Sequence, residues 1–294
     1  MANRIRFCSK ELLAWACVFL TLTGLISCGT QHDATRLEAE VQEALEALKT
    51  FDYAKTEHLL QKNVSHLDKA SPLRVEAHYA LALSKWHRTP PKREATEQAR
   101  SILVSLLKEP LDPQLKGQLQ LDIARIDEVV DYPGDQPRID DARVVYRELM
   151  QTHRDDIGFQ AAMRLANSYA KHADTQGLEE AVRILNSYLK DCPDLPEWKS
   201  MAYMYLGRLY GGPLNKPGEA LDVLQKAHQL GFITTSREDE SLWRMAQWAE
   251  KAGRQNESLP YYRIIIKEKP RSQFQTLARI RYEAISGQTI DPGP

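Results

Sequence analysis

The chain lacks an excess of either charge and lacks the residue pattern of β-strands. Its 294 residues carry 39 basic and 40 acidic side chains, a formal net charge of -1. Nucleic-acid binding depends on many phosphate contacts from lysine and arginine, so this balance argues against that class of function. Alternating runs of valine, isoleucine and threonine are nearly absent, which argues against a β-rich fold.

Catalytic and metal-binding patterns are missing as well. The sequence contains no HExxH, CxxC, GxSxG, GxGxxG or Walker sequence. The eight histidines are scattered, and none has a partner at the spacing of metal ligands. Carboxylate pairs such as Asp155-Asp156 lie at expected helix starts, where their negative charge interacts favourably with the helix dipole. We therefore expect a protein that is not an enzyme and that holds no metal or cofactor.

The N-terminus carries an export signal. Three basic residues in the first ten positions precede an apolar run from Leu12 to Leu25. This run is typical of a signal peptide and too short for a secure membrane span. The segment Leu25-Ile26-Ser27-Cys28 resembles the bacterial lipoprotein pattern, which implies cleavage before Cys28, acylation of that cysteine and attachment to a membrane by lipid. Gly29 after the cysteine favours, by the same resemblance, the outer membrane facing the periplasm. An ordinary cleaved signal beside a cysteine is the alternative.

Removal of residues 1–27 leaves 36 basic and 39 acidic side chains and two of the four cysteines. With Cys28 carrying lipid, Cys192 stands alone and cannot form an intramolecular disulfide. Its acidic and rigid neighbours do not stabilise a thiolate, so we expect a packed or inert thiol. An interchain bond or a nucleophilic role is the alternative.

Helical periodicity runs through the mature chain. From Thr35 to Ile285, apolar residues recur at steps of three and four, which predicts an all-helical chain. Proline and glycine interrupt this pattern at regular intervals, as at Thr89-Pro90-Pro91 and Gly211-Gly212-Pro213, and there they end or begin helices. The spacing predicts about twelve helices and a final one near Ser272–Ile285, with short connections that make neighbours antiparallel.

These helices repeat one pattern. In the first helix of each pair a large residue, a large-small pair and an aromatic residue recur, and the second helix brings small, large and small or aromatic residues before a closing proline. The three clearest units contain Ala162, Leu165, Ala166, Tyr169, Ala181, Leu185, Tyr188 and Pro193; Tyr203, Leu206, Gly207, Tyr210, Ala220, Leu224 and Ala227; and Leu242, Met245, Ala246, Ala249, Ser258, Tyr262, Ile265 and Pro270. This pattern resembles the tetratricopeptide repeat (TPR) of about 34 residues.

The resemblance implies an all-α, TPR-like α-solenoid of antiparallel helical hairpins with a C-terminal capping helix. We expect a signal peptide at 1–27, a lipidated tether at 28–34, six hairpins and the cap at 35–286, and a disordered tail at 287–294. The turns between 86 and 140 are lengthened, with an insertion at Tyr132–Gln136. Small residues such as Gly207 are predicted where two helices of a hairpin approach each other.

In TPR proteins the first helices line a groove that holds an extended peptide or a partner helix. Carried over onto this sequence by counting from each small residue, that groove receives eleven candidate residues in addition to Leu121. They are Tyr79, Trp86, Arg125, Met163, Asn167, Lys171, Met204, Arg208, Trp243, Gln247 and Lys251. Asn167, Lys171 and Arg208 resemble part of the family's backbone or carboxylate clamp. Met163, Met204 and Trp243 favour an adaptable apolar surface, or else pack against the next hairpin.

Two functions remain open at this stage. The first is a lipid-anchored, non-enzymatic scaffold that binds peptides or partner proteins of envelope complexes. The second is a solute-binding accessory lipoprotein of a transporter, motivated by the methionines, Trp243 and Tyr79. Neither involves nucleic acid. The fold alone does not choose between them, because one fold hosts many functions.

Overall fold

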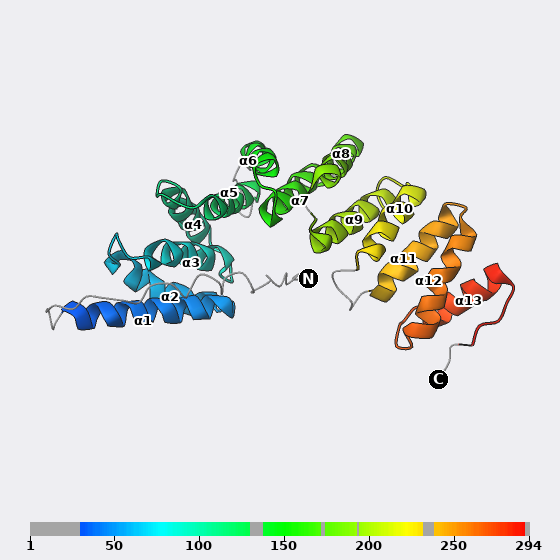
Figure 1. The fold of residues 1–294 in the computed structure, drawn as a ribbon, viewed down its shortest axis with the longest axis horizontal. Helices are drawn as coiled ribbons and strands as arrows, with labels where there is room; N and C mark the ends of the chain where they lie inside the picture. The colour runs from blue at the N-terminus through cyan, green and yellow to red at the C-terminus, as the bar shows by residue number, and fades with distance from the viewer. Residues whose placement is uncertain (1–29, 130–137, 172–173, 193, 232–237, 292–294) are drawn as a thin grey trace. The chain divides into compact units, whose positions relative to one another are not determined.

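The computed structural model describes residues 30–129, 138–171, 174–192, 194–231 and 238–291. The signal peptide, Cys28 and the insertion at Tyr132–Gln136 lie outside these ranges. Within them the regular structure is helical (Figure 1), as predicted. The helices are α1 (Thr30–Lys49), α2 (Tyr53–Asn63), η1 (Val64–His66), α3 (Leu73–His87), α4 (Arg93–Leu106), α5 (Pro113–Glu128), α6 (Ile139–Thr152), α7 (Asp156–Ala170), α8 (Thr175–Asp191), α9 (Pro196–Gly211), α10 (Pro217–Gln229), α11 (Glu238–Lys251), α12 (Gln255–Glu268) and α13 (Gln275–Ser286).

Helix starts follow the local sequence. Asp112 caps α5 by accepting a hydrogen bond from the Leu115 backbone N–H at 2.9 Å, and Pro113 occupies the first helical position. Asp155 and Asp174 cap α7 and α8 in the same way. An aspartate cap satisfies backbone N–H groups that the first turn leaves unpaired, and proline costs nothing there. The acidic and proline positions therefore define where these helices begin.

The chain divides into two compact units, and the division falls inside α3. The first, residues 1–80, contains the α1–α2 pair, in which the Thr56 hydroxyl donates to the Ala44 carbonyl at 3.2 Å and Asn63 donates to Glu40 at 2.7 Å. Helix α1 begins at Thr30, inside the segment assigned to the lipidated tether. This unit is a helical hairpin followed by a short 3-10 turn and the first part of α3.

The second unit, residues 81–294, is built from stacked pairs. Helix α5 packs on α6, α7 on α8, α9 on α10 and α11 on α12, with α13 against α12. Successive pairs stack through their first helices, α5 on α7 and α7 on α9, and through α8 on α9 and α10 on α11. The predicted order of hairpins and a final cap is confirmed, because each pair buries against its successor the apolar stripe that it cannot cover alone.

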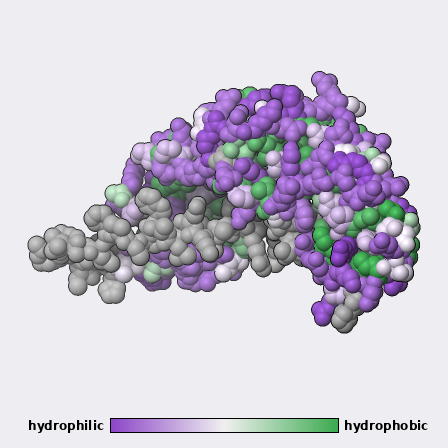
Figure 2. Space-filling model, turned by 45° about the vertical axis from the view of Figure 1, so that its right-hand side comes forward, coloured by the Kyte–Doolittle hydropathy of each residue, from purple (hydrophilic) through white to green (hydrophobic). Residues whose placement is uncertain are grey.

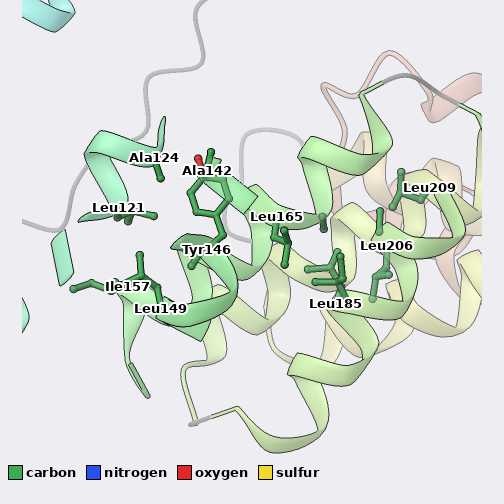
Figure 3. Packing of buried hydrophobic residues seen from close by; sticks show 14 of the residues in the cluster. Leu121, Ala124, Ala142, Tyr146, Leu149, Ile157, Leu165, Leu185, Leu206 and Leu209 are labelled. Carbon is green, nitrogen blue, oxygen red and sulfur yellow. The ribbon is translucent and has the colours of Figure 1, made fainter. Parts of the chain in front are cut away.

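The two larger apolar clusters run through several of these pairs. One joins α5 to α10, with Tyr146 and Leu165 buried at its centre; Figure 3 shows side chains of α5, α6, α7, α8 and α9 meeting in it. The other joins α10 to α13 around Met245, Tyr262 and Ile265. Since neither cluster belongs to a single hairpin, the pairs depend on one another for burial.

The expected close approach at Gly207 is confirmed. A Cβ added there would lie 2.9 Å from Leu224 Cδ2, on the second helix of the same hairpin. Gly211, one turn further along α9, is tighter: its Cβ would lie 2.1 Å from Cζ2 of Trp248 on α11. The two glycines therefore leave room on α9 for Leu224 of the same hairpin and for Trp248 of the next hairpin.

Two carboxylates link successive elements by hydrogen bonds and ion pairs. Asp127 of α5 accepts two hydrogen bonds from Arg100 of α4, at 2.7 and 2.9 Å, and pairs with Arg138 at the start of α6 at 3.0 Å. Glu250 of α11 accepts from Tyr262 of α12 and Arg281 of α13. Burial raises the pKa of Glu250, but these two hydrogen bonds outweigh it and hold the pKa below its ordinary value. Each carboxylate links three successive elements.

The C-terminal end shows two features that the sequence pattern does not indicate. Residues 287–291, expected in a disordered tail, turn back on α13: Ile290 packs against the second cluster and its N–H donates to Glu283 at 3.3 Å. Helix α13 also exposes Leu277 and Ile280 on its outer side. Hydrophilic side chains nevertheless dominate the face seen in Figure 2. None of the described helices is both long and apolar enough to span a membrane.

Candidate interaction surface

The first helices α5, α7 and α9 lie in contact and bring polar side chains together. Asp122 of α5 is buried and accepts from Gln118 at 3.1 Å and from Arg125 Nη1 at 2.9 Å. The Arg125 guanidinium also lies over the ring of Trp86 from α3, 4.8 Å from its centroid. A carboxylate on one side and an aromatic ring on the other fix the plane of this guanidinium.

Glu128, one turn after Arg125, is also buried. It accepts a 2.8 Å hydrogen bond from the hydroxyl of Tyr146 on α6. Burial raises the pKa of Tyr146 and the negative charge of Glu128 raises it further, so the phenol stays protonated and keeps donating. On α7, burial lowers the pKa of Arg164, and the neighbouring guanidinium of Arg125 lowers it further. Tyr146, Glu128 and Asp122 act in the other direction and raise the pKa of Arg164.

The row of polar groups continues onto α9. The Tyr205 hydroxyl donates to the Asn167 side-chain oxygen at 3.2 Å, which joins α9 to α7. Arg208 stacks over the Tyr205 ring at 5.7 Å. Burial raises the pKa of Tyr205; Arg208 lowers it and Glu128 raises it, which places both charges within electrostatic reach of the phenol. We call the set Asp122, Arg125, Glu128, Gln160, Arg164, Asn167, Tyr205 and Arg208 the polar face.

Some residues predicted for the groove belong to this face or extend it. Arg125 is half-buried, while Asn167 and Arg208 are exposed. Lys171 caps the C-terminus of α7 and is exposed, as are Gln247 and Lys251 on α11. Tyr79 is half-buried in the first unit and is described with that unit alone. The structure therefore brings Trp86 against Arg125, and brings both Asn167 and Arg208 against Tyr205.

The apolar groove residues have a different role. Met163 packs against the first cluster, and Met204 and Trp243 pack against the second. The Trp243 ring lies parallel to that of Phe274, with centroids 5.3 Å apart and an interplanar angle of 9°. Leu121, also expected in the groove, is fully buried. Packing against the next hairpin, the alternative left open by the sequence, describes these side chains.

Packing residues and polar residues occupy fixed positions relative to the small residue of each first helix. The small residues of α5, α7, α9 and α11 are Ala124, Ala166, Gly207 and Ala246. In each helix the residue three positions before the small one packs in an apolar cluster; these residues are Leu121, Met163, Met204 and Trp243. The residue two positions before it, in contrast, is polar or aromatic with a polar tip. These residues are Asp122, Arg164, Tyr205 and Arg244. Asp122, Arg164 and Tyr205 were not among the predicted groove residues, because the prediction used the position three residues before the small one. The repeated polar character two residues before it was the signal in the sequence that could have identified them.

A hollow of about 600 Å³ is open to solvent and lined mainly by charged side chains. It is lined by side chains of α6, α7 and α8, including Arg143, Tyr169, Glu180 and Arg183. Arg143 donates to the Ser168 hydroxyl and carbonyl at 3.0 and 2.8 Å, and Arg183 pairs with Glu180 at 2.6 Å. Its cations are therefore already satisfied by their own neighbours, and its lining does not resemble the apolar pocket expected for a small solute.

Groups with catalytic chemistry are not gathered in the part of the chain that the structure describes. No set of three or more histidine, cysteine or carboxylate side chains there is placed to hold a metal ion. Burial raises the pKa of the Cys192 thiol, and Asp194 and Asp191 raise it while Lys199 lowers it. The thiol form is therefore favoured, in agreement with an inert cysteine.

Comparison with known proteins supports the architecture. No protein-family model matches the sequence, and no curated protein matches it. Among solved structures, the chain is similar to Pseudomonas aeruginosa PilF, with 14% identity, a TM-score of 0.50, and coverage of 88% of this chain and 99% of PilF. It is also similar to "kinesin light chain nearly identical TPR-like repeats" from Podospora anserina, with 16% identity, a TM-score of 0.46, and coverage of 67% and 95%.

Identities this low establish the fold alone. The class defined by the helix order and by the likeness to PilF is the TPR-like α-solenoid, an all-α architecture of stacked helical pairs. Such a fold is suited to protein interaction, because its first helices present a row of side chains to a partner.

Proposed function

We propose that the chain is a non-enzymatic scaffold that binds an extended segment of a partner protein along the polar face and is held in the bacterial cell envelope by a lipid on Cys28. The polar face is the observation that carries the binding half of this proposal. It spans three first helices, and its side chains are fixed by contacts such as Tyr205 to Asn167 and Arg125 to Trp86. Side chains held in place before binding lose little entropy when a partner arrives.

The chemistry of the face suits a peptide backbone. Asn167 offers an amide beside the Tyr205 hydroxyl, and Arg208 lies on the Tyr205 ring with its charge exposed. Amide and guanidinium donors can hydrogen-bond the carbonyl groups of an extended chain without requiring particular side chains. We assign the partner to envelope proteins on the basis of the signal sequence and the Leu25-Ile26-Ser27-Cys28 pattern.

Photocrosslinking in the native cell tests the binding surface. A benzophenone side chain placed at Lys171, exposed at the end of α7, is expected to give discrete adducts with a partner protein. The same group at Asn256, exposed on α12, serves as the matched control and should give none of those adducts. Adding Asn167→Ala and Arg208→Ala to the Lys171 probe should weaken its adducts several-fold, because two polar contacts are lost together. Identical adducts from both positions would refute the polar face as the binding surface.

Metabolic labelling tests the anchor. Cells fed a radiolabelled fatty acid are expected to label the wild-type chain and leave Cys28→Ser unlabelled, and outer-membrane fractions should contain the wild type only. Acyl chains contribute about 0.8 kcal/mol per buried methylene, so loss of the lipid releases the protein from the membrane. Cys192→Ser, which changes the other mature cysteine, is the control and should behave as wild type. Labelling that persists in Cys28→Ser would contradict the lipoprotein assignment.

A further inference from the structure

Two buried donor atoms and one half-buried guanidinium on the polar face have no acceptor among the described residues. Nε of Arg125 and Nε2 of Gln160 are buried and make no hydrogen bond within the described residues. Arg164 lies one turn after Gln160 on α7, half-buried, and among the placed side chains none accepts a hydrogen bond from it or forms an ion pair with it. Buried donors in folded proteins are nearly always paired, so two unpaired buried donors beside an unpaired guanidinium call for an explanation.

The two guanidinium groups are also neighbours of like charge. Burial and the charge of Arg125 both lower the pKa of Arg164, and together they outweigh the opposite effect of Tyr146, Glu128 and Asp122. Placing like charges together in a desolvated position destabilises the folded chain unless something else compensates for it. Such an arrangement is typical of a site whose missing counterion arrives with a ligand.

The carboxylates of the face do not supply that counterion. Asp122 is held by Gln118 and by Arg125 Nη1. Glu128 accepts from Tyr146. Neither lies within ion-pair distance of Arg164 in the described part of the chain. Arg125 and Arg164, together with the exposed Lys171 and Arg208, carry four positive charges, and Asp122 and Glu128 carry two negative charges.

We propose that Arg125, Gln160 and Arg164 form a receptor for the carboxylate side chains of the partner, so that the scaffold selects an acidic segment. This inference rests on the proposed function and names its partner chemistry. Arg125 already donates Nη1 to Asp122, whereas the Arg164 guanidinium makes no ion pair with the described side chains. Arg164 therefore offers a planar fork, which carboxylates match with two parallel hydrogen bonds. Gln160 and Arg164 are one turn apart, about 5.4 Å. In an extended segment, side chains on one side recur at about 6.6 Å, a comparable spacing.

Titration with blocked peptides tests the receptor. The full chain in mild detergent is titrated with fluorescein-labelled hexaglutamate whose termini are acetylated and amidated, and with hexaglutamine of the same design; fluorescence anisotropy reports binding. Hexaglutamate is expected to bind well at low salt and more weakly as salt rises. Hexaglutamine, which can use only the backbone contacts, should bind more weakly and with little dependence on salt, because only hexaglutamate carries charge. Equal binding of both peptides, or binding of neither, would overturn the proposal.

Variants assign the effect to Arg164. Arg164→Gln should weaken hexaglutamate binding by about tenfold to a hundredfold, the loss expected for a charge-assisted hydrogen bond. The matched control is Arg244→Gln: Arg244 occupies the same register position on α11 but is paired with Glu240 at 2.5 Å, and its loss should change binding by less than about twofold. Arg164→Gln should also melt at the same temperature as wild type or higher, because an unpaired charge is removed.

The outcomes separate this inference from the proposed function. If Lys171 crosslinks a partner in cells but hexaglutamate fails to bind, the scaffold stands and the acidic selection falls. If both fail, the scaffold falls as well. Inorganic phosphate that binds more tightly than hexaglutamate at equal ionic strength would overturn the carboxylate assignment in favour of a phosphate group.

Discussion

Gly211→Ala is expected to lower the free energy of unfolding by about 2–3 kcal/mol, in the upper part of the range for overpacked contacts. The added methyl group would lie 2.1 Å from Cζ2 and 2.2 Å from Cε2 of Trp248, whose indole is 9% exposed and enclosed in the second apolar cluster. A buried indole cannot turn aside without displacing its neighbours, so the clash must be relieved by separating α9 from α11.

Two other glycines provide controls. At Gly207 the new methyl group meets Leu224 Cδ2, the end of a flexible side chain, so Gly207→Ala should be nearly neutral whereas Gly207→Leu should cost about 1–3 kcal/mol. At Gly218, in the first turn of α10, nothing lies within 4 Å of the added atom, and alanine should stabilise by up to about 1 kcal/mol. Urea unfolding followed by circular dichroism measures all three. Equal stability of Gly211→Ala and Gly218→Ala would show that α9 and α11 do not pack as described.

Trp243→Ala is expected to destabilise the α11–α13 end by about 2–4 kcal/mol, somewhat less than a fully buried tryptophan because Trp243 is half-buried. Its ring stacks on Phe274 and lies 5.5 Å from that of Tyr262, so its removal opens a space that two other aromatic rings line. Trp243→Phe, which keeps a ring against Phe274, should lose less than half as much. Thermal melts compare the two variants.

This experiment also separates a packing role from a binding role. A tryptophan that contacts a partner can be truncated with little effect on folding and a large loss of binding. For Trp243 we expect the reverse: Trp243→Phe should leave crosslinking from Lys171 unchanged. A stable Trp243→Ala chain with weakened crosslinking would return this residue to the interaction surface.

The architecture was predictable because its signals are local and repeated. Proline, glycine and aspartate mark the helix ends, as at Asp112-Pro113 and Gly211, and a small residue such as Gly207 recurs at a fixed place in each unit. Stacking of one pair on the next follows from apolar stripes that a single pair cannot bury. The turn of residues 287–291 back onto α13 was not predictable, since it depends on Ile290 finding the second cluster.

The surface was predicted less well than the fold. Periodicity places Met163 and Arg164 on adjacent sides of α7, and the repeat pattern does not say which of the two meets the preceding hairpin. That choice depends on how far each first helix is rotated against its neighbours, a property of the assembled stack. The coupling of Arg164 to Arg125 also joins residues 39 positions apart, and the separate helix patterns carry no trace of it.

The register of the stack has an evolutionary consequence. Packing residues and residues of the proposed binding surface occupy neighbouring offsets from the same small residue. Leu121, Met163, Met204 and Trp243 pack at one offset, and Asp122, Arg164 and Tyr205 of the polar face lie at the other. Substitutions at the second offset can alter partner preference one unit at a time while the interior of the molecule is inherited unchanged. A lineage can therefore exchange partners by point mutation without rebuilding its framework, and homologues should vary far more at the second offset than at the first.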